Sequence, residues 1–211
     1  MPLDERAAAA VRTRGGSPLA VWLAGVTGDE HPGVRARVVV VGAGAPAVPV
    51  AGVDVVVAEA GPQAAATLTT PEVAAGVDAG RELAAAAAGD GIAVLAGVSA
   101  APADALASWL TGGAPGPEIR GPLGALRRLG GGELTVLTGL ALGAGERGLG
   151  YVCEGLAASA AAGVAVAVEP DLRPRLLAGR PSAQPLHGAL LERLGLAPAG
   201  GDVLAALAGS L

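Results

Sequence analysis

Short runs of β-branched residues alternate along this chain with longer stretches that are rich in Ala and Leu. Parallel strands need crossover connections, and helices supply most of them, so this alternation indicates a parallel sheet covered by helices. The sequence therefore predicts a fold of the α/β class. The expected strands are residues 19–24, 37–41, 53–58, 92–95, 151–153 and 176–178.

The best-marked helix lies between the third and fourth of these strands. Thr70 can cap it, Pro71 fits its first turn, Glu72 suits the positive end of its dipole, and Gly89 ends it. Because periodicity cannot decide a short apolar run, residues 164–168 are left open between helix and strand. Further helices are expected at residues 102–110, 133–147, 156–162, 186–194 and 203–207.

The length of 211 residues suits one domain with a full hydrophobic core. We therefore expect a single α/β domain over residues 1–211, interrupted by a loop rich in Gly and Pro at about residues 112–124.

Composition disfavours several kinds of function. All 14 basic residues are Arg, and the net charge of −5 argues against a nucleic-acid partner, because phosphate binding needs clustered positive charge. The single cysteine, Cys153, and the two histidines argue against a disulfide framework and a metal site. No signal-peptide pattern opens the chain, and its longest uncharged run is broken by Gly and Pro. The sequence thus predicts a cytoplasmic protein with no metal, no cofactor and no membrane partner.

Three motifs follow one another in the C-terminal half of the chain. They are residues 130–134 (Gly-Gly-Gly-Glu-Leu), 151–156 (Tyr-Val-Cys-Glu-Gly-Leu) and 182–187 (Ser-Ala-Gln-Pro-Leu-His). In order and spacing they resemble a Gly-Gly-x-Glu turn, a strand that runs into Asp-Gly, and a Ser-Ala-Glu-Pro-Gly-His signature. These three patterns are typical of the nicotinate-nucleotide:dimethylbenzimidazole phosphoribosyltransferase family of cobalamin assembly. The chain resembles a shortened and diverged member of that family.

The resemblance implies a three-layer α/β/α fold with a mostly parallel, Rossmann-like sheet, usually in a homodimer. It also implies a nucleotide-binding transferase. The family displaces nicotinate from nicotinate mononucleotide with the nitrogen of a benzimidazole-type base, which gives α-ribazole phosphate.

The resemblance also assigns site residues. Glu133 and Asp202 are the expected catalytic carboxylates, because a carboxylate can take the proton from the attacking azole. Asp202 lies in residues 200–206, the nearest counterpart of the segment that carries the family's catalytic glutamate. The expected substrate-binding residues are Gly97, Ser99, Gly130, Gly131 and Ser182; backbone amides of Gly-rich turns can approach a phosphate closely.

Departures from the family leave a second hypothesis open. The family's phosphate and ribose loop is reduced to residues 96–100, and its Asp-His-Gly turn after the first strand has no counterpart in residues 25–28. The chain has no Lys; Arg120, Arg127 or Arg128 can supply a charge, but with different geometry. The alternative is therefore a non-catalytic paralogue that binds a nucleotide or an α-ribazole-type ligand, or a subunit of a larger assembly.

Simpler roles compete at individual positions. The stretch 42–47 (Gly-Ala-Gly-Ala-Pro-Ala), with Glu59, suggests a dinucleotide site, but its prolines favour a plain strand–loop–strand connection. Glu133 also suits the start of a helix, and Ser182 suits a helix N-cap. His187 suits a surface or capping position as well as a ligand contact.

Overall fold

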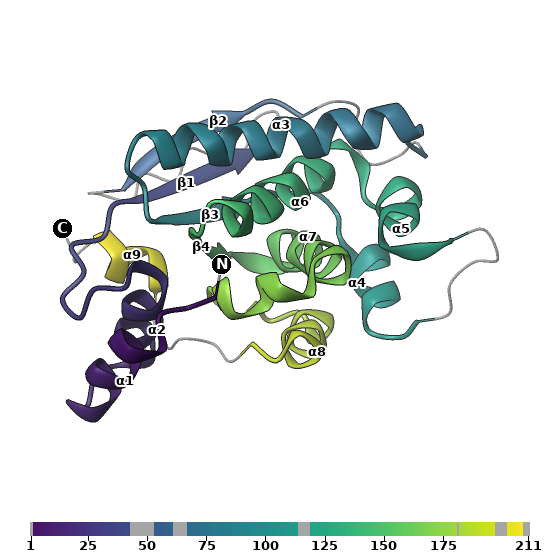
Figure 1. Cartoon of the computed structure of the whole chain (residues 1–211). Helices are drawn as coiled ribbons and strands as arrows, with labels where there is room; N and C mark the ends of the chain where they lie inside the picture. Colours follow the sequence, from purple (N-terminus) through teal and green to yellow (C-terminus); the bar gives the residue numbers. More distant parts are fainter. Residues whose placement is uncertain are drawn as a thin grey trace.

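Five parallel strands form one sheet in the part of the chain that the computed structural model describes, residues 2–42, 53–60, 67–113, 119–180, 182–196 and 202–208 (Figure 1). The strand order is β2-β1-β3-β4-β5, and every neighbouring pair is parallel. The predicted α/β class is therefore confirmed. The strands are β1 (Ala36–Val41), β2 (Asp54–Ala58), β3 (Val94–Val98), β4 (Gly150–Cys153) and β5 (Leu176–Ala178).

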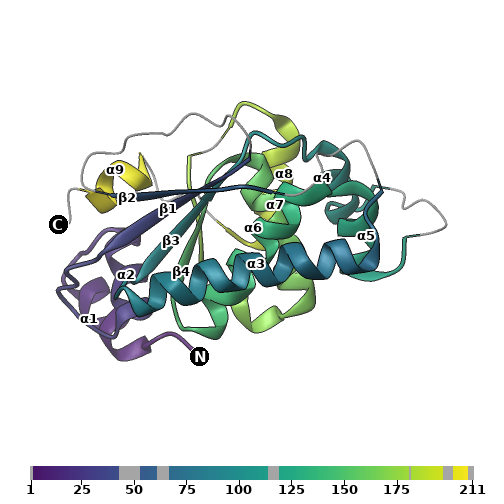
Figure 2. The same ribbon diagram turned by 90° about the horizontal axis from the view of Figure 1, so that it is seen from above.

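Helices cover both faces of this sheet, as the alternating side chains of β1 show. Val39 and Val41 join a large core, whereas Val38 and Val40 join a smaller one. The large core includes α3 (Thr70–Gly89), α4 (Asp104–Leu110), α5 (Gly121–Leu129), α6 (Gly131–Glu146), α7 (Gly155–Val168) and α8 (Pro185–Leu194). The smaller core includes α2 (Pro18–Thr27) and α9 (Val203–Ala208), with α1 (Glu5–Thr13) packed on α2 (Figure 2). The predicted three-layer α/β/α arrangement is confirmed.

The strand predicted at residues 19–24 is wrong, because this segment forms α2. Its start carries helix signals: Ser17 accepts a hydrogen bond from the Ala20 N–H at 3.2 Å, and Pro18 occupies the first turn. Gly28 ends it in the left-handed conformation. The helix is apolar along most of its length and has no polar face, so its sequence looks like a buried strand. The first strand is therefore β1, and residues 25–28 do not follow a strand.

Several boundaries also differ from expectation. Thr69 rather than Thr70 caps α3, in a capping box that lowers the pKa of the Glu72 carboxyl through hydrogen bonds to Thr69. Residues 164–168 are helical, as the end of α7. The loop expected at residues 112–124 is shorter, because α5 begins at Gly121 with Pro122 in its first turn.

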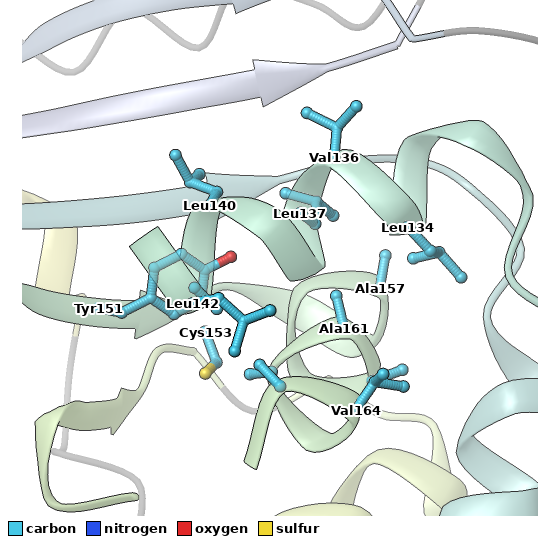
Figure 3. Close-up of a cluster of buried hydrophobic side chains, with 14 of the residues drawn as sticks. Leu134, Val136, Leu137, Leu140, Leu142, Tyr151, Cys153, Ala157, Ala161 and Val164 are labelled. Atoms are coloured by element: carbon cyan, nitrogen blue, oxygen red, sulfur yellow. The ribbon is translucent and has the colours of Figure 1, made fainter. Parts of the chain in front are cut away.

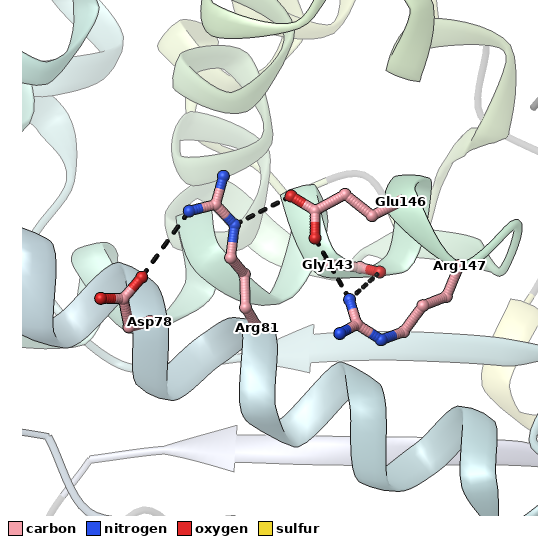
Figure 4. A network of polar contacts seen from close by, with 5 residues as sticks. All are labelled: Asp78, Arg81, Gly143, Glu146 and Arg147. Atoms are coloured by element: carbon pink, nitrogen blue, oxygen red, sulfur yellow. Dashed lines mark hydrogen bonds and ion pairs between the residues drawn. The ribbon is translucent and has the colours of Figure 1, made fainter.

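The helices α3 and α6 cross at backbone contact. A Cβ on Gly80 of α3 would lie 2.1 Å from the Val136 carbonyl oxygen, and one on Gly139 of α6 would lie 2.0 Å from the Val77 carbonyl oxygen. Only glycine fits at such a distance. Beside the crossing, Arg81 of α3 pairs with Glu146 of α6 at 2.9 Å (Figure 4). The close crossing lets a chain without Phe build a dense core.

Buried side chains of α6, β4 and α7 meet in the large core (Figure 3). Tyr151 of β4 is fully buried there, and its hydroxyl has no hydrogen-bond partner among the described residues. Burial raises the pKa of the Tyr151 hydroxyl and of the Cys153 thiol, so both groups stay protonated at neutral pH.

No described helix is both long enough and apolar enough to cross a membrane.

Candidate functional site

The strand order creates a crevice between β1 and β3. From β1 the chain moves to β2 on one side, and then crosses to β3 on the other side of β1. Open α/β sheets bind ligands where the order reverses in this way, outside the carboxyl ends of the strands. The described residues at this point are Gly42, directly after β1, and Ser99, directly after β3.

A carboxylate from α6 reaches this crevice. Glu133, in the first turn of α6, accepts a hydrogen bond from the Ser99 hydroxyl, which in turn accepts one from the Ala101 N–H at 2.9 Å. A Cβ on Gly42 would lie 2.8 Å from the Glu133 carboxylate, so the carboxylate rests against the Gly42 backbone. Two of the predicted site residues, Ser99 and Glu133, are therefore in direct contact at the crevice.

The three predicted glycines lie inside the molecule. Gly97 is buried in β3, where a Cβ would lie 2.2 Å from the Tyr151 hydroxyl oxygen. Gly130 and Gly131 are buried at the junction of α5 and α6; a Cβ on Gly130 would lie 2.6 Å from the Leu126 carbonyl oxygen. Buried positions of this kind are closed in by protein atoms, and contact of these glycines with a substrate stays a prediction.

A second polar cluster lies beyond the carboxyl ends of β4 and β5. The Arg180 N–H donates to Glu154 at 3.2 Å, and the Arg180 guanidinium pairs with Asp202. Asp202 also accepts a hydrogen bond from the Ala205 N–H at 3.1 Å, which caps α9. Burial raises the pKa of the half-buried Glu154 carboxyl, against the lowering effects of the Arg180 N–H and its charge.

Glu154 and Arg180 were not predicted as site residues. The sequence carried one signal for Glu154, since it stands where the family motif has Asp. Nothing in the sequence marks Arg180, whose backbone N–H reaches Glu154 because β4 and β5 are adjacent.

The two predicted catalytic carboxylates do not meet. Glu133 belongs to α6 on the large-core face of the sheet, whereas Asp202 precedes α9 on the other face. Neighbouring strands lie about 4.8 Å apart, so the ends of β3 and β5 are separated by roughly 10 Å across β4. Glu133 and Asp202 thus flank the same edge of the sheet without touching.

His187 is buried, so a surface position for this residue is wrong. Its Nδ1 accepts a hydrogen bond from the Ser182 N–H at 3.1 Å and lies 2.9 Å from the Ser182 hydroxyl. Its Nε2 lies 3.0 Å from the Ser159 hydroxyl, which donates to the Gly155 carbonyl at 2.8 Å. Ser182 does not cap α8, because the N-cap is Gln184. The imidazole therefore ties the segment after β5 to α7.

This arrangement makes stability depend on pH. Burial lowers the pKa of His187 from 6.5, so the unfolded chain binds the proton more readily than the folded protein does. We expect full stability above about pH 6.5 and a decline as the pH falls through the lower folded pKa. Protonated Nδ1 can no longer accept from Ser182, a loss of about 1–3 kcal/mol.

The measurement is urea unfolding between pH 8 and pH 5. His187→Asn should flatten the decline, whereas the exposed His31→Asn should leave it unchanged. If the stability of His187→Asn fell with pH as much as that of the unaltered protein, a group other than His187 would cause the pH dependence.

Among the described residues, no group of three or more His, Cys, Asp or Glu side chains can hold a metal ion. The sequence suggested a dinucleotide site at residues 42–47, and residues 43–47 of that stretch lie outside the described residues. Gly200 and Gly201, which precede Asp202 in the predicted catalytic segment, also lie outside them. Glu59 is exposed after β2.

Comparison with known proteins gives both sequence and fold relatives. The family model described as Phosphoribosyltransferase (DBI_PRT) matches residues 111–201. The nicotinate-nucleotide–dimethylbenzimidazole phosphoribosyltransferase of Desulforudis audaxviator is 39% identical over 82 residues, which cover 39% of this chain and 23% of that protein. The enzyme of the same name from Variovorax paradoxus is 43% identical over 77 residues, which cover 36% of this chain and 22% of that protein. The sequence matches thus span less than a quarter of these relatives.

The fold similarity extends further. A crystal structure of the nicotinate-nucleotide–dimethylbenzimidazole phosphoribosyltransferase from Thermus thermophilus matches with a TM-score of 0.75 at 23% identity, over 99% of this chain and 96% of that chain. A structure of CobT from the same organism matches with a TM-score of 0.73. The predicted resemblance is confirmed: the chain is a diverged relative of the nicotinate-nucleotide–dimethylbenzimidazole phosphoribosyltransferases, alike in sequence over its C-terminal part and in fold over nearly its whole length.

Proposed function

We propose that this protein transfers a phosphoribosyl group from nicotinate mononucleotide to a nitrogen of a benzimidazole-type base. The observation that carries the proposal is the Glu133 carboxylate held by Ser99 at the crevice between β1 and β3. This carboxylate lies within the segment that the phosphoribosyltransferase family model matches. A new bond forms between the azole nitrogen and the ribose carbon, the bond to nicotinate breaks, and the azole proton passes to a carboxylate.

We assign this proton transfer to Glu133 and retain Asp202 as a second catalytic candidate. The Asp202 carboxylate already has the Arg180 guanidinium as an ion-pair partner, which must be displaced before the carboxylate can face a substrate. Glu154 has a raised pKa in the same cluster, which makes it an additional acid–base candidate. We assign substrate contacts to Ser99, Gly97, Gly130, Gly131 and Ser182, as the resemblance implies. A homodimer acting in the cytoplasm completes the proposal.

A second candidate is a binding protein that does not turn its ligand over. The contact between Ser99 and Glu133, and the ion pair between Arg180 and Asp202, favour it, because both carboxylates already have partners. Such a protein retains the crevice and binds α-ribazole phosphate or a related nucleotide.

One assay separates these candidates. The protein is incubated with nicotinate mononucleotide and dimethylbenzimidazole, and nicotinate and α-ribazole phosphate are quantified by chromatography. Equal amounts of both products support the transferase. Saturable binding of α-ribazole phosphate without turnover supports the binding protein. If neither ligand raises the melting temperature, both candidates are excluded, since a ligand that binds the native state must stabilise it.

A further inference from the structure

A hollow of about 450 Å³ opens between α4, α7, α8 and the 3₁₀ helix η1 (Pro170–Arg175), which pack together in the helical layer (Figure 1). Sites for small molecules commonly have volumes of roughly 300–1,000 Å³. No residue of the candidate site lines this hollow. Its walls include the later turns of α7 and α8, helices that begin beyond the carboxyl ends of β4 and β5. The hollow is therefore a separate feature that lies away from the candidate site.

Two arginines are the charged side chains of this hollow among the described residues. Arg173 comes from η1 and Arg193 from the last turn of α8, and both are exposed. The Arg173 guanidinium also reaches the end of α8, because its Nη1 atom would lie 3.8 Å from a Cβ on Gly195. Within the described part of the chain, neither arginine side chain forms an ion pair or a hydrogen bond.

The acidic residues that are near these arginines in the sequence do not neutralise them. Glu169 and Asp171 line a different hollow, on the side of α6, and Glu192 does not line this one. The whole chain carries a net charge of −5, so a hollow with two unpaired cations departs from its general charge. Such a hollow favours an anionic ligand, because guanidinium groups bind phosphate and carboxylate through paired hydrogen bonds.

The remaining walls of the hollow are apolar. Trp109 of α4 is partly buried, and its indole N–H donates to no other described residue. The other lining residues are Leu110, Gly112, Gly163, Val166, Ala167, Pro170, Leu190 and Leu194. An indole with aliphatic neighbours suits a flat apolar ring, since aromatic rings stack on one another.

A simpler role for one arginine is an interaction with the end of a helix. The C-terminal end of a helix attracts cations, and α8 offers such an end to Arg193. This attraction needs neither the hollow nor Trp109, and it predicts no ligand. The two roles therefore differ in whether an organic anion binds.

We propose that this hollow binds a small organic anion with a flat apolar body, an aromatic phosphate or carboxylate. Arg173 and Arg193 bind the anionic group, and the ring lies against Trp109 and the aliphatic walls. This site goes beyond the proposed function and does not depend on it, because it uses none of the residues assigned to the transfer reaction.

Isothermal titration calorimetry with 1-naphthyl phosphate tests the site. The unaltered protein should bind this probe saturably. 1-Naphthol lacks the charge and inorganic phosphate lacks the ring, so each should bind weaker by about tenfold or more. A titration with 1-naphthoate shows which anionic group the arginines prefer.

Variants assign the binding to the hollow. Arg173→Gln/Arg193→Gln should weaken the binding of 1-naphthyl phosphate by about tenfold or more, because both charged donors are lost. Ala167→Phe should weaken it with both arginines intact, because the larger side chain fills the hollow. Arg12→Gln and Ala9→Phe, both at exposed positions of α1, are the matched controls and should bind like the unaltered protein.

Circular dichroism and thermal melts establish that the variants are folded. The proposal is overturned if the unaltered protein does not bind 1-naphthyl phosphate, or if 1-naphthol binds as tightly. It is also overturned if the folded double variant binds the probe as the unaltered protein does. A negative transfer assay leaves these measurements unchanged, so failure of this site and failure of the proposed reaction are distinguishable.

Discussion

Gly139→Val is expected to reduce the free energy of unfolding by about 3 kcal/mol or more. The first side-chain carbon would lie 2.0 Å from the Val77 carbonyl oxygen, which belongs to the backbone of α3 and cannot rotate away. Relief requires α3 and α6 to separate, and that opens the core that both helices form over the sheet. Urea unfolding followed by circular dichroism measures the loss.

Gly188→Ala supplies the matched control. Gly188 lies inside α8, where an added Cβ meets no atom within 4 Å. Alanine is favoured over glycine in a helix interior, so this variant should gain about 0.5–1 kcal/mol. If Gly139→Val were as stable as the unaltered protein, the backbone contact between α3 and α6 would be contradicted.

This crossing also shows where sequence patterns stop being informative. The small residues of α6 could be recognised as part of a helix, and Thr70, Pro71 and Glu72 marked the start of α3 to within one residue of its cap, Thr69. The facing positions of Gly80 and Gly139 could not be predicted, because they depend on how two helices pack that are separated in the chain by β3, α4 and α5. The same limit explains α2, since a helix that is apolar along most of its length carries no period to distinguish it from a strand.

The candidate site, like the fold, could be predicted only in part from the sequence. Family motifs and loop position marked Ser99 and Glu133 separately, but only the fold brings the end of β3 to the first turn of α6. Asp202 was predicted as a second catalytic carboxylate, yet it precedes α9, which packs on the opposite face of the sheet from α6. His187 was left open between a surface or capping role and a ligand contact. Its partner Ser182 lies nearby in the same motif, but its other partner, Ser159, belongs to α7 and could not be predicted.

The second large effect is expected at the Glu133 carboxylate, the proposed proton acceptor. Glu133→Gln is expected to lower the rate of phosphoribosyl transfer by about 10²- to 10⁴-fold, the usual contribution of a general base. Glutamine keeps the size of the side chain, and its carbonyl oxygen can still accept from Ser99, so the crevice keeps its shape. The amide cannot take up the azole proton. Steady-state kinetics with nicotinate mononucleotide and dimethylbenzimidazole measure the change.

Two further variants decide which cluster holds the base. Asp202→Asn removes the charge that pairs with Arg180 but keeps an oxygen for the Ala205 N–H, and Glu154→Gln removes the carboxylate with the raised pKa. If Glu133→Gln retains most of the activity while either of these variants loses it, the proton acceptor lies beyond β4 and β5. If Glu133→Gln alone is inactive at unchanged stability, the crevice between β1 and β3 holds the base. The second cluster then serves to orient the substrate, because it lies beyond the ends of β4 and β5, one and two strand spacings from the end of β3.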